Sequence, residues 1–272
     1  MVLGSRSRGI KGSSNTNQRT PAPFCLEYIE YFGYMEPQDK AYSLDLGLID
    51  YTAARDLQLK IVEAKKKGLL DQDVFLILEH APVFTLGLRG GKDHLKVPEA
   101  FLVSRNIPLV HIERGGDITY HGPGQLVIYP IVNLRTGRWR VVSFVETLEE
   151  LMLRIARDWG IQAERRPLNR GIWVGHDKLG SVGIAVRRSV SFHGLALNIN
   201  TDLEPFQWID PCGLEGVSVT SIQRLIGKTI NMQTVRDRAI AHIQDIFKIT
   251  LETVSRDNLE RILHSELRSR VI

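Results

Sequence analysis

Apolar residues follow two different spacings along this chain, and each spacing predicts its own kind of element. Residues 141–159 place apolar side chains three and four positions apart, with Gly160 after them, which predicts an amphipathic helix. Residues 74–79 form a compact apolar run of strand length. By the same criteria we expect helices over residues 50–67, with Asp50 as the N-cap and Gly68 just beyond the end, from Pro98 to just before Pro108, and near 234–247 and 255–267. We expect strands over residues 83–86, where the sheet continues beyond Pro82, and over residues 109–113, 125–134, 171–174, 179–186 and 193–199.

Helical and strand signals alternate through the body of the chain, with no internal repeat and no clear linker. This order predicts one α+β (α/β) domain over residues 24–272, with a mixed, largely antiparallel sheet flanked by helices. Residues 1–23 are rich in Ser, Gly, Asn, Thr and Arg without apolar periodicity, so we expect a disordered basic tail. A short organelle-targeting segment has the same composition, and that alternative stays open.

The formal net charge of +4 changes little about the expected partners. Residues 1–23 carry four basic residues and no acid, so the body of the chain is neutral and nucleic-acid binding loses its main support. No apolar stretch approaches the roughly 20 residues that span a bilayer, so membrane insertion is not expected. Two cysteines, Cys25 and Cys212, imply no disulfide framework and fit a reducing compartment, with the cytoplasm as our expectation.

Basic residues gather in two places within the neutral body. Solvated loops and docking surfaces for acidic proteins are both open interpretations of them. The clusters are Arg135, Arg138 and Arg140, and Arg165, Arg166 and Arg170.

A glycine-rich segment, RGGDITYHGPGQ, runs from Arg114 to Gln125. Its glycines let the backbone turn sharply and approach a ligand closely, while Tyr120 and His121 offer a flat wall and a polar tip. It is neither a dinucleotide-binding fingerprint nor a phosphate-binding loop of the Gly-Lys-Ser/Thr type. A tight loop between strands explains the pattern equally well.

Lys178 and Cys212 are the candidate reactive residues. Lys178 begins an apolar strand signal with small residues beside it; most lysines are solvated, but one desolvated next to a cysteine favours the thiolate. Cys212 lies between Pro211 and Gly213 in a polar loop, unlike an inert core cysteine. A metal site of His121, His193 and Cys212 lacks a closely spaced ligand pair, so we expect no metal.

Together these segments resemble the lipoyl(octanoyl) transferase family, the octanoyl-[acyl-carrier-protein]:protein N-octanoyltransferases of lipoate biosynthesis. The resemblance covers roughly residues 40 to 230, and Cys212 follows Lys178 by 34 positions, as in the family. The motifs that carry it, in the family's order, are RGGDITYHGPGQ, KLGSVG, HGLALNI and DPCG.

The resemblance implies a fold shared with biotin protein ligases and lipoate ligases, and a role for each matching residue. The acyl-thioester nucleophile falls on Cys212, and the lysine that lowers its pKa falls on Lys178. The implied substrate-binding residues are Arg114, Gly115, Gly116, Asp117, Ile118, Thr119, Tyr120, His121, Ser181, Val182, Gly183, Gly194, Leu195 and Ala196.

The implied reaction moves an octanoyl group from octanoyl-acyl carrier protein to a specific lysine of a lipoyl domain, the first step of protein lipoylation. The implied acceptors are 2-oxoacid dehydrogenase subunits and the glycine cleavage H protein, and no cofactor or ATP is required. An ATP-dependent lipoate-protein ligase of the same fold is the alternative enzyme, and it would need no thiol nucleophile. A silent acyl- or carrier-binding module is a third interpretation, although such a module needs neither Lys178 nor Cys212.

Overall fold

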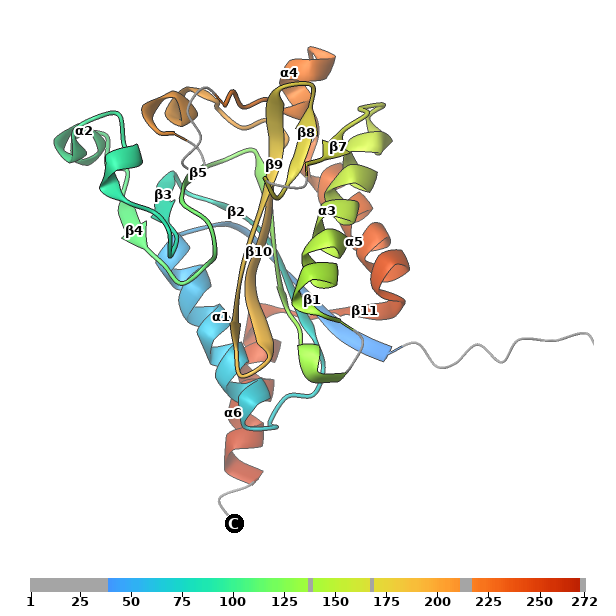
Figure 1. Cartoon of the computed structure of the whole chain (residues 1–272). Coiled ribbons are helices and arrows are strands. Elements are labelled where there is room, and N and C mark those ends of the chain that lie inside the picture. Colours follow the sequence, from blue (N-terminus) through green and yellow to red (C-terminus); the bar gives the residue numbers. More distant parts are fainter. Residues whose placement is uncertain (1–38, 137–138, 167–168, 211–216, 270–272) are drawn as a thin grey trace, which may run out of the picture. The chain divides into compact units, whose positions relative to one another are not determined.

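The computed structural model describes residues 39–136, 139–166, 169–210 and 217–269, and the predicted tail at 1–23 lies outside them. An eight-stranded sheet forms the centre of this part of the chain (Figure 1). Its pairs are antiparallel except for those that β1 makes with β11 and β2, which are parallel. In spatial order the strands are β11 (Ile249–Thr253), β1 (Asp39–Ile49), β2 (Val74–His80), β6 (Gln125–Ile131), β10 (Val190–Asn198), β9 (Asp177–Arg187), β8 (Ile172–Val174) and β7 (Glu164–Arg165).

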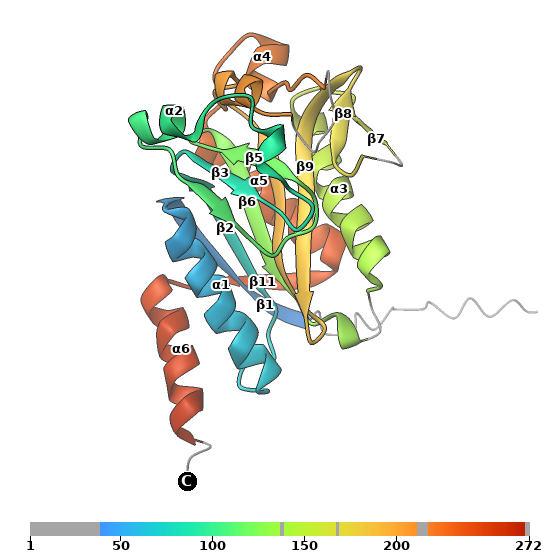
Figure 2. The ribbon, with the colours of Figure 1, turned by 60° about the vertical axis from the view of Figure 1, so that its left-hand side comes forward.

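Helices cover both faces of this sheet. On one face α3 (Val141–Asp158) and α5 (Met232–Phe247) pack over a core that includes Phe144, Leu151 and Phe247. On the other face α1 (Tyr51–Lys66) and α6 (Arg256–Ser269) lie side by side in Figures 1 and 2, over a core that includes Leu57 and Leu259. The predicted α+β class and the mixed, largely antiparallel sheet are confirmed.

A second sheet of three strands lies beside the main one, in the order β4 (Leu109–His111), β3 (Val83–Leu86) and β5 (Ile118–His121). The expectation that residues 83–86 continue the main sheet was therefore wrong, because β3 leaves it after Pro82 and pairs with β4 and β5. The loop predicted between residues 113 and 125 contains β5. Helix α2 (Glu99–Ser104) and the 3₁₀ turn η3 (Glu204–Trp208) add Phe101, Leu102 and Phe206 to the core on this sheet.

Local capping explains where the main predicted helices begin and end. The Asp50 carboxylate accepts the N–H groups of Thr52 and Ala53, at 2.8 and 3.2 Å, so it caps α1 as predicted. Gly68 and Gly160 follow α1 and α3 with φ of +64° and +75°, a left-handed conformation that favours glycine. The strands and α-helices that were not predicted are β1, β5, β7, β11 and α4 (Ile222–Ile226).

Candidate active site

A cavity of about 510 Å³ lies over strands β9 and β10. Its walls also include the start of α1, Val145 of α3 and the glycine-rich segment after β4. The structure brings almost all of the predicted substrate-binding residues to this one cavity. Its lining contains Arg114, Gly115, Gly116, Asp117, Ile118, Thr119, His121, Ser181, Val182, Gly183, Gly194, Leu195 and Ala196, together with Lys178.

Lys178 lies in the cavity wall near the start of β9 and is only 4% exposed. Its backbone N–H donates to the Ser218 carbonyl over 2.9 Å, and its backbone carbonyl accepts the Thr220 N–H over 3.0 Å. Its ammonium lies 5.3 Å from the centre of the Trp173 ring. A Cβ at Gly171 would lie 2.2 Å from the Gly180 carbonyl oxygen and 3.1 Å from the Lys178 Cε, and φ at Gly171 is +119°, so a glycine is needed behind this lysine.

Cys212 lies outside the described residues, but both neighbouring stretches are held beside the cavity. On one side the Asp210 N–H donates to the His94 carbonyl over 2.9 Å, and the Asp210 carboxylate lies 2.6 Å from the Lys96 ammonium. On the other side Ser218 and Thr220 pair with Lys178. His94 and Lys178 both line the cavity, so Asp210 and Ser218, on either side of residues 211–216, are both bonded to residues of the cavity wall.

The Arg114 guanidinium is directed to the neighbouring strand β3. Its Nη2 donates to the carbonyl and to the hydroxyl of Thr85, each over 2.8 Å. The next residue, Gly115, donates its N–H to the Ile184 carbonyl over 3.0 Å, and Gly116 has φ of +92°. These contacts fix the glycine-rich segment between the small sheet and β9, so its backbone forms one side of the cavity.

His94 was not predicted, and it joins two parts of the site. Its Nδ1 lies 2.6 Å from a carboxylate oxygen of Asp117, whose other oxygen accepts the Ile118 N–H over 2.6 Å. The bond to Asp117 raises the pKa of His94 above its ordinary value. His94 lies in an irregular, charged stretch, where no sequence periodicity indicates that Asp117 is its partner.

Tyr120 and His121 point to opposite sides of β5, as neighbouring residues in a strand do. The Tyr120 ring packs against Phe84 and Phe206, at centroid distances of 5.2 and 5.6 Å, so Tyr120 belongs to the core of the small sheet and does not line the cavity. His121 lines the cavity, and its Nδ1 lies 2.7 Å from the Gln125 side-chain oxygen.

A chain of buried amides leads from His121 towards Lys178. The Gln125 amide donates to the Asn198 side-chain oxygen over 2.9 Å, and the Asn198 amide donates to the Thr220 carbonyl over 3.1 Å. All of these side chains are buried. The chain fixes residue 220 against β10, so it supports the same backbone that pairs with Lys178.

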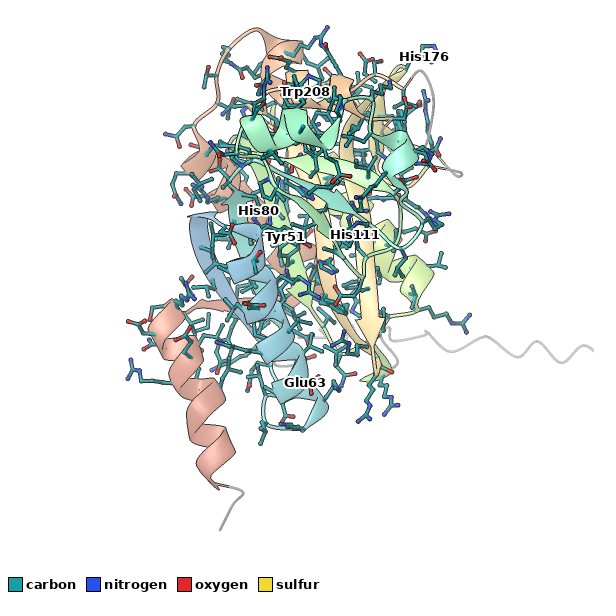
Figure 3. All side chains as sticks on the ribbon, turned by 90° about the vertical axis from the view of Figure 1, so that its left-hand side faces the viewer. Tyr51, Glu63, His80, His111, His176 and Trp208 are labelled. Atoms are coloured by element: carbon teal, nitrogen blue, oxygen red, sulfur yellow. The ribbon has the colours of Figure 1, made fainter. Side chains whose placement is uncertain are left out.

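Five imidazole and phenol side chains converge at the end of the cavity away from Lys178, which we call the far end. Tyr51 and His80 meet at a centroid distance of 5.1 Å (Figure 3), and His80 Nε2 lies 2.7 Å from the Tyr129 hydroxyl. His121 lies 5.7 Å from His80, and His193 lies 6.1 Å from Tyr129, between ring centroids. The cluster was not predicted, because its members come from α1, β2, β5, β6 and β10.

Burial keeps the imidazoles of this cluster neutral. Loss of hydration lowers the pKa of His80 to about 4, and it lowers the pKa of His121 and of His193 to about 3. Nearby charge adds to this effect, since Arg114 lowers the pKa of both His121 and His193. The imidazoles of this cluster are thus uncharged at neutral pH, while the Arg114 guanidinium near them carries its charge. Among the residues that the structure describes, no group of three or more His, Cys, Asp or Glu side chains is arranged to hold a metal ion.

The second basic cluster is largely neutralised by acids. Arg165 and Arg170 pair with Glu149, and they also pair with Glu150 and Glu146, respectively. Arg166 lies near Glu164 and over the Trp173 ring. This cluster therefore braces α3 against β7 and β8, which weakens its interpretation as a docking surface. In the first cluster, Arg138 lies outside the described residues, and Arg135 donates to the Ser189 hydroxyl.

Residues 50–244 match the family described as the lipoyl protein ligase A/B catalytic domain. The chain is 48% identical to an octanoyltransferase of Desulfotalea psychrophila over 209 residues, which is 76% of this chain and 94% of the relative. It is 44% identical to an octanoyltransferase of Syntrophobacter fumaroxidans over 225 residues, which is 83% and 98% of the two chains. The chain belongs to the octanoyltransferase family.

Membership of the octanoyltransferase family makes this chain an acyltransferase, and it confirms the resemblance stated from the sequence motifs. Among solved structures the fold is similar to that of lipoate-protein ligase A bound with ATP, with a TM-score of 0.67 and 17% identity over 85% of this chain and 95% of the ligase. At that identity the likeness concerns the fold alone. In the described part of this octanoyltransferase, no helix has the length and apolar character needed to cross a membrane.

Proposed function

We propose that this octanoyltransferase takes its octanoyl group from octanoyl-acyl carrier protein and delivers it to a specific lysine of a lipoyl domain, through a thioester on Cys212. The expected acceptors are lipoyl domains of 2-oxoacid dehydrogenase subunits and the glycine cleavage H protein. A cytoplasmic location remains our prediction, with an organelle matrix as the alternative if residues 1–23 are a targeting segment.

The observation that carries this proposal is the backbone pairing of Lys178 with residues 218–220 at the cavity wall. That pairing attaches the chain after Cys212 to the strand that bears Lys178. On the other side Cys212 is two residues from Asp210, and two residues of chain span at most about 7 Å. The anchored ends thus support a thiol that works beside Lys178 and the cavity.

In the first half-reaction the Cys212 thiolate attacks the carbonyl carbon of the carrier thioester. The new C–S bond forms as the bond to the carrier's sulfur breaks, and the carrier leaves as a thiol after taking a proton from the Lys178 ammonium, which becomes a neutral amine. A nearby ammonium favours the thiolate, which is the role proposed for Lys178. The acyl-enzyme keeps an activated bond, so the reaction needs no ATP.

In the second half-reaction the acceptor lysine attacks the Cys212 thioester as a neutral amine. The amide bond forms, the Cys212 sulfur leaves as a thiolate, and the amine nitrogen loses a proton for which Lys178 is the proposed acceptor. The residues Arg114–His121, Ser181–Gly183 and Gly194–Ala196 are the proposed substrate contacts. Tyr120 is excepted because it lies outside the cavity lining, so its proposed part is to support β5.

The apolar part of the cavity wall suits an acyl chain. Val182, Ile184, Leu195 and Ala196 line it. Burial of about six methylenes is worth on the order of 5 kcal/mol, which is enough to hold the chain in place while the carrier exchanges with the acceptor.

Intact-mass spectrometry tests the nucleophile. After incubation with octanoyl-acyl carrier protein, the native protein and Cys25→Ser are expected to gain one octanoyl group, and Cys212→Ser none. An adduct that persists in Cys212→Ser, or one that requires Cys25, would overturn the mechanism.

A second assay separates the transferase from an ATP-dependent ligase. Transfer from octanoyl-acyl carrier protein to a lipoyl domain without ATP is expected, with the product lost when the acceptor lysine is replaced by arginine. Activity of Cys212→Ser with free octanoate and ATP would instead support the ligase.

A further inference from the structure

The end of the cavity away from Lys178 contains buried polar atoms that no group of the described residues satisfies. Tyr51 and His193 both line the cavity, and each is 2% exposed. Within the described ranges, neither the Tyr51 hydroxyl nor the His193 Nε2 has a hydrogen-bond partner. That Nε2 lies 3.7 Å from a Glu113 carboxylate oxygen, which is beyond hydrogen-bond distance.

The backbone at His193 departs from the strand in a way that maintains this arrangement. Its φ is +57°, a left-handed value that is uncommon for a residue other than glycine. Residues held in such sparsely populated conformations cluster at functional sites. Its N–H donates to the side-chain oxygen of the fully buried Gln58 on α1, over 2.7 Å. Helix α1 therefore holds His193 in place and also provides Tyr51 from its first turn.

The register of the β9–β10 hairpin sets the distance from this polar end to Lys178. His193 pairs with Ile184, which is six residues along β9 from Lys178, so about 20 Å separates the two Cα positions. The Lys178 and His193 side chains both line the cavity, so the free length between them is shorter than this. An extended eight-carbon chain has seven C–C bonds of about 1.5 Å and spans roughly 9 Å.

We propose that Tyr51 and His193 form a polar end wall that sets the longest acyl chain this enzyme accepts efficiently. The inference rests on the proposed function, in which the acyl carbonyl lies at the Lys178 end. A longer chain brings methylenes against the hydroxyl and the imidazole, which water can satisfy and a methylene cannot. The loss of these polar interactions opposes the gain from burying the extra methylenes. We therefore expect acylation to be less efficient with chains longer than eight carbons.

The test compares chain lengths within a single variant. Native protein, Tyr51→Phe and the control Tyr42→Phe are each mixed with equal octanoyl-, decanoyl- and dodecanoyl-acyl carrier protein. The early ratio of adducts is then read by intact mass. Tyr51→Phe keeps the ring and removes only the unpartnered hydroxyl, whereas Tyr42 lies on β1 outside the cavity lining.

We expect the decanoyl-to-octanoyl ratio to rise about tenfold in Tyr51→Phe and to stay at the native value in Tyr42→Phe. Because the ratio is internal to each variant, a change in overall stability does not imitate this result. An unchanged ratio in Tyr51→Phe, with octanoyl adducts still forming, would overturn the end wall alone. No adduct of any length on the native protein would instead overturn the proposed acyl-enzyme.

Discussion

The Nδ1 atom of His94 lies 2.6 Å from the carboxylate of Asp117, and the main-chain carbonyl of His94 holds the N–H of Asp210. One residue thus connects the glycine-rich wall of the cavity to the chain just before Cys212. The charged pair exists only while the imidazole is protonated, so this connection depends on pH.

The first prediction concerns the pH dependence of that pair. Because the folded-state pKa of His94 is raised, its stabilisation is fully present below the unfolded pKa near 6.5 and is lost as pH rises through the folded pKa. The difference in unfolding free energy between native protein and His94→Gln should therefore be larger near pH 5.5 than near pH 8.5. Urea unfolding at the two pH values measures it, and a difference that grows with pH would contradict the ion pair.

The second prediction concerns Lys178 and the thiolate. Lys178→Ala should slow acylation of Cys212 near pH 7, and raising the pH towards the ordinary thiol pKa of about 8.5 should recover part of the rate. Single-turnover acylation followed by mass spectrometry across this range provides the measurement. An equal loss at every pH would mean that Lys178 positions the substrate and does not favour the thiolate.

The third prediction compares two glycines. A Cβ at Gly194 would lie 2.1 Å from the Ile128 carbonyl oxygen, so Gly194→Ala must force β10 away from β6 and should cost several kcal/mol. Gly175 has φ of +56° with no atom near its Cβ position, so Gly175→Ala should cost only about 1 kcal/mol from backbone strain. Thermal unfolding of both variants tests the order, and similar losses would show that β10 can shift.

The fourth prediction concerns Glu149, a fully buried carboxylate behind Lys178. It accepts the Gly171 N–H over 2.8 Å and pairs with Arg165 and Arg170. Glu149→Ala leaves that N–H without its acceptor and should cost about 3 kcal/mol.

The matched control for Glu149 is Glu146→Ala. Its side chain is half exposed and lies 3.7 Å from Arg170, so its loss should cost less than about 1 kcal/mol. Denaturant unfolding of both variants tests the contrast. Equal losses would mean that the arginines, rather than the buried acceptor, account for the effect.

The sequence predicted those parts of the fold that local patterns determine. The apolar stripe of α3 and the Asp50 cap of α1 were both found. Strand β1 was missed because its alternation includes charged residues and is interrupted by an irregularity between Asp45 and Gly47. Strand β11 was missed because it is short and mostly exposed.

The residues of the candidate site were likewise predicted where a contiguous motif contains them and missed where only packing brings them together. Motifs placed Lys178 and the glycine-rich segment correctly at one cavity, because their residues are contiguous in the sequence. Tyr120 was grouped with its neighbours, although the alternation of β5 turns it into the core of the small sheet. The cluster of Tyr51, His80, His121, Tyr129 and His193 depends on how five separate elements pack, so no spacing along the chain predicts it.

The pairing of β1 with β11 has a consequence for how the protein is made. Asp39 aligns with Ile249 in that pair, so the two strands are joined by a loop of roughly 200 residues. On the ribosome, one edge of β1 stays without its partner until almost the whole domain has emerged, and an open strand edge is a template for association with other chains. Rapid translation of many copies should thus make aggregation compete with completion of the sheet, and co-expressed chaperones should raise the yield.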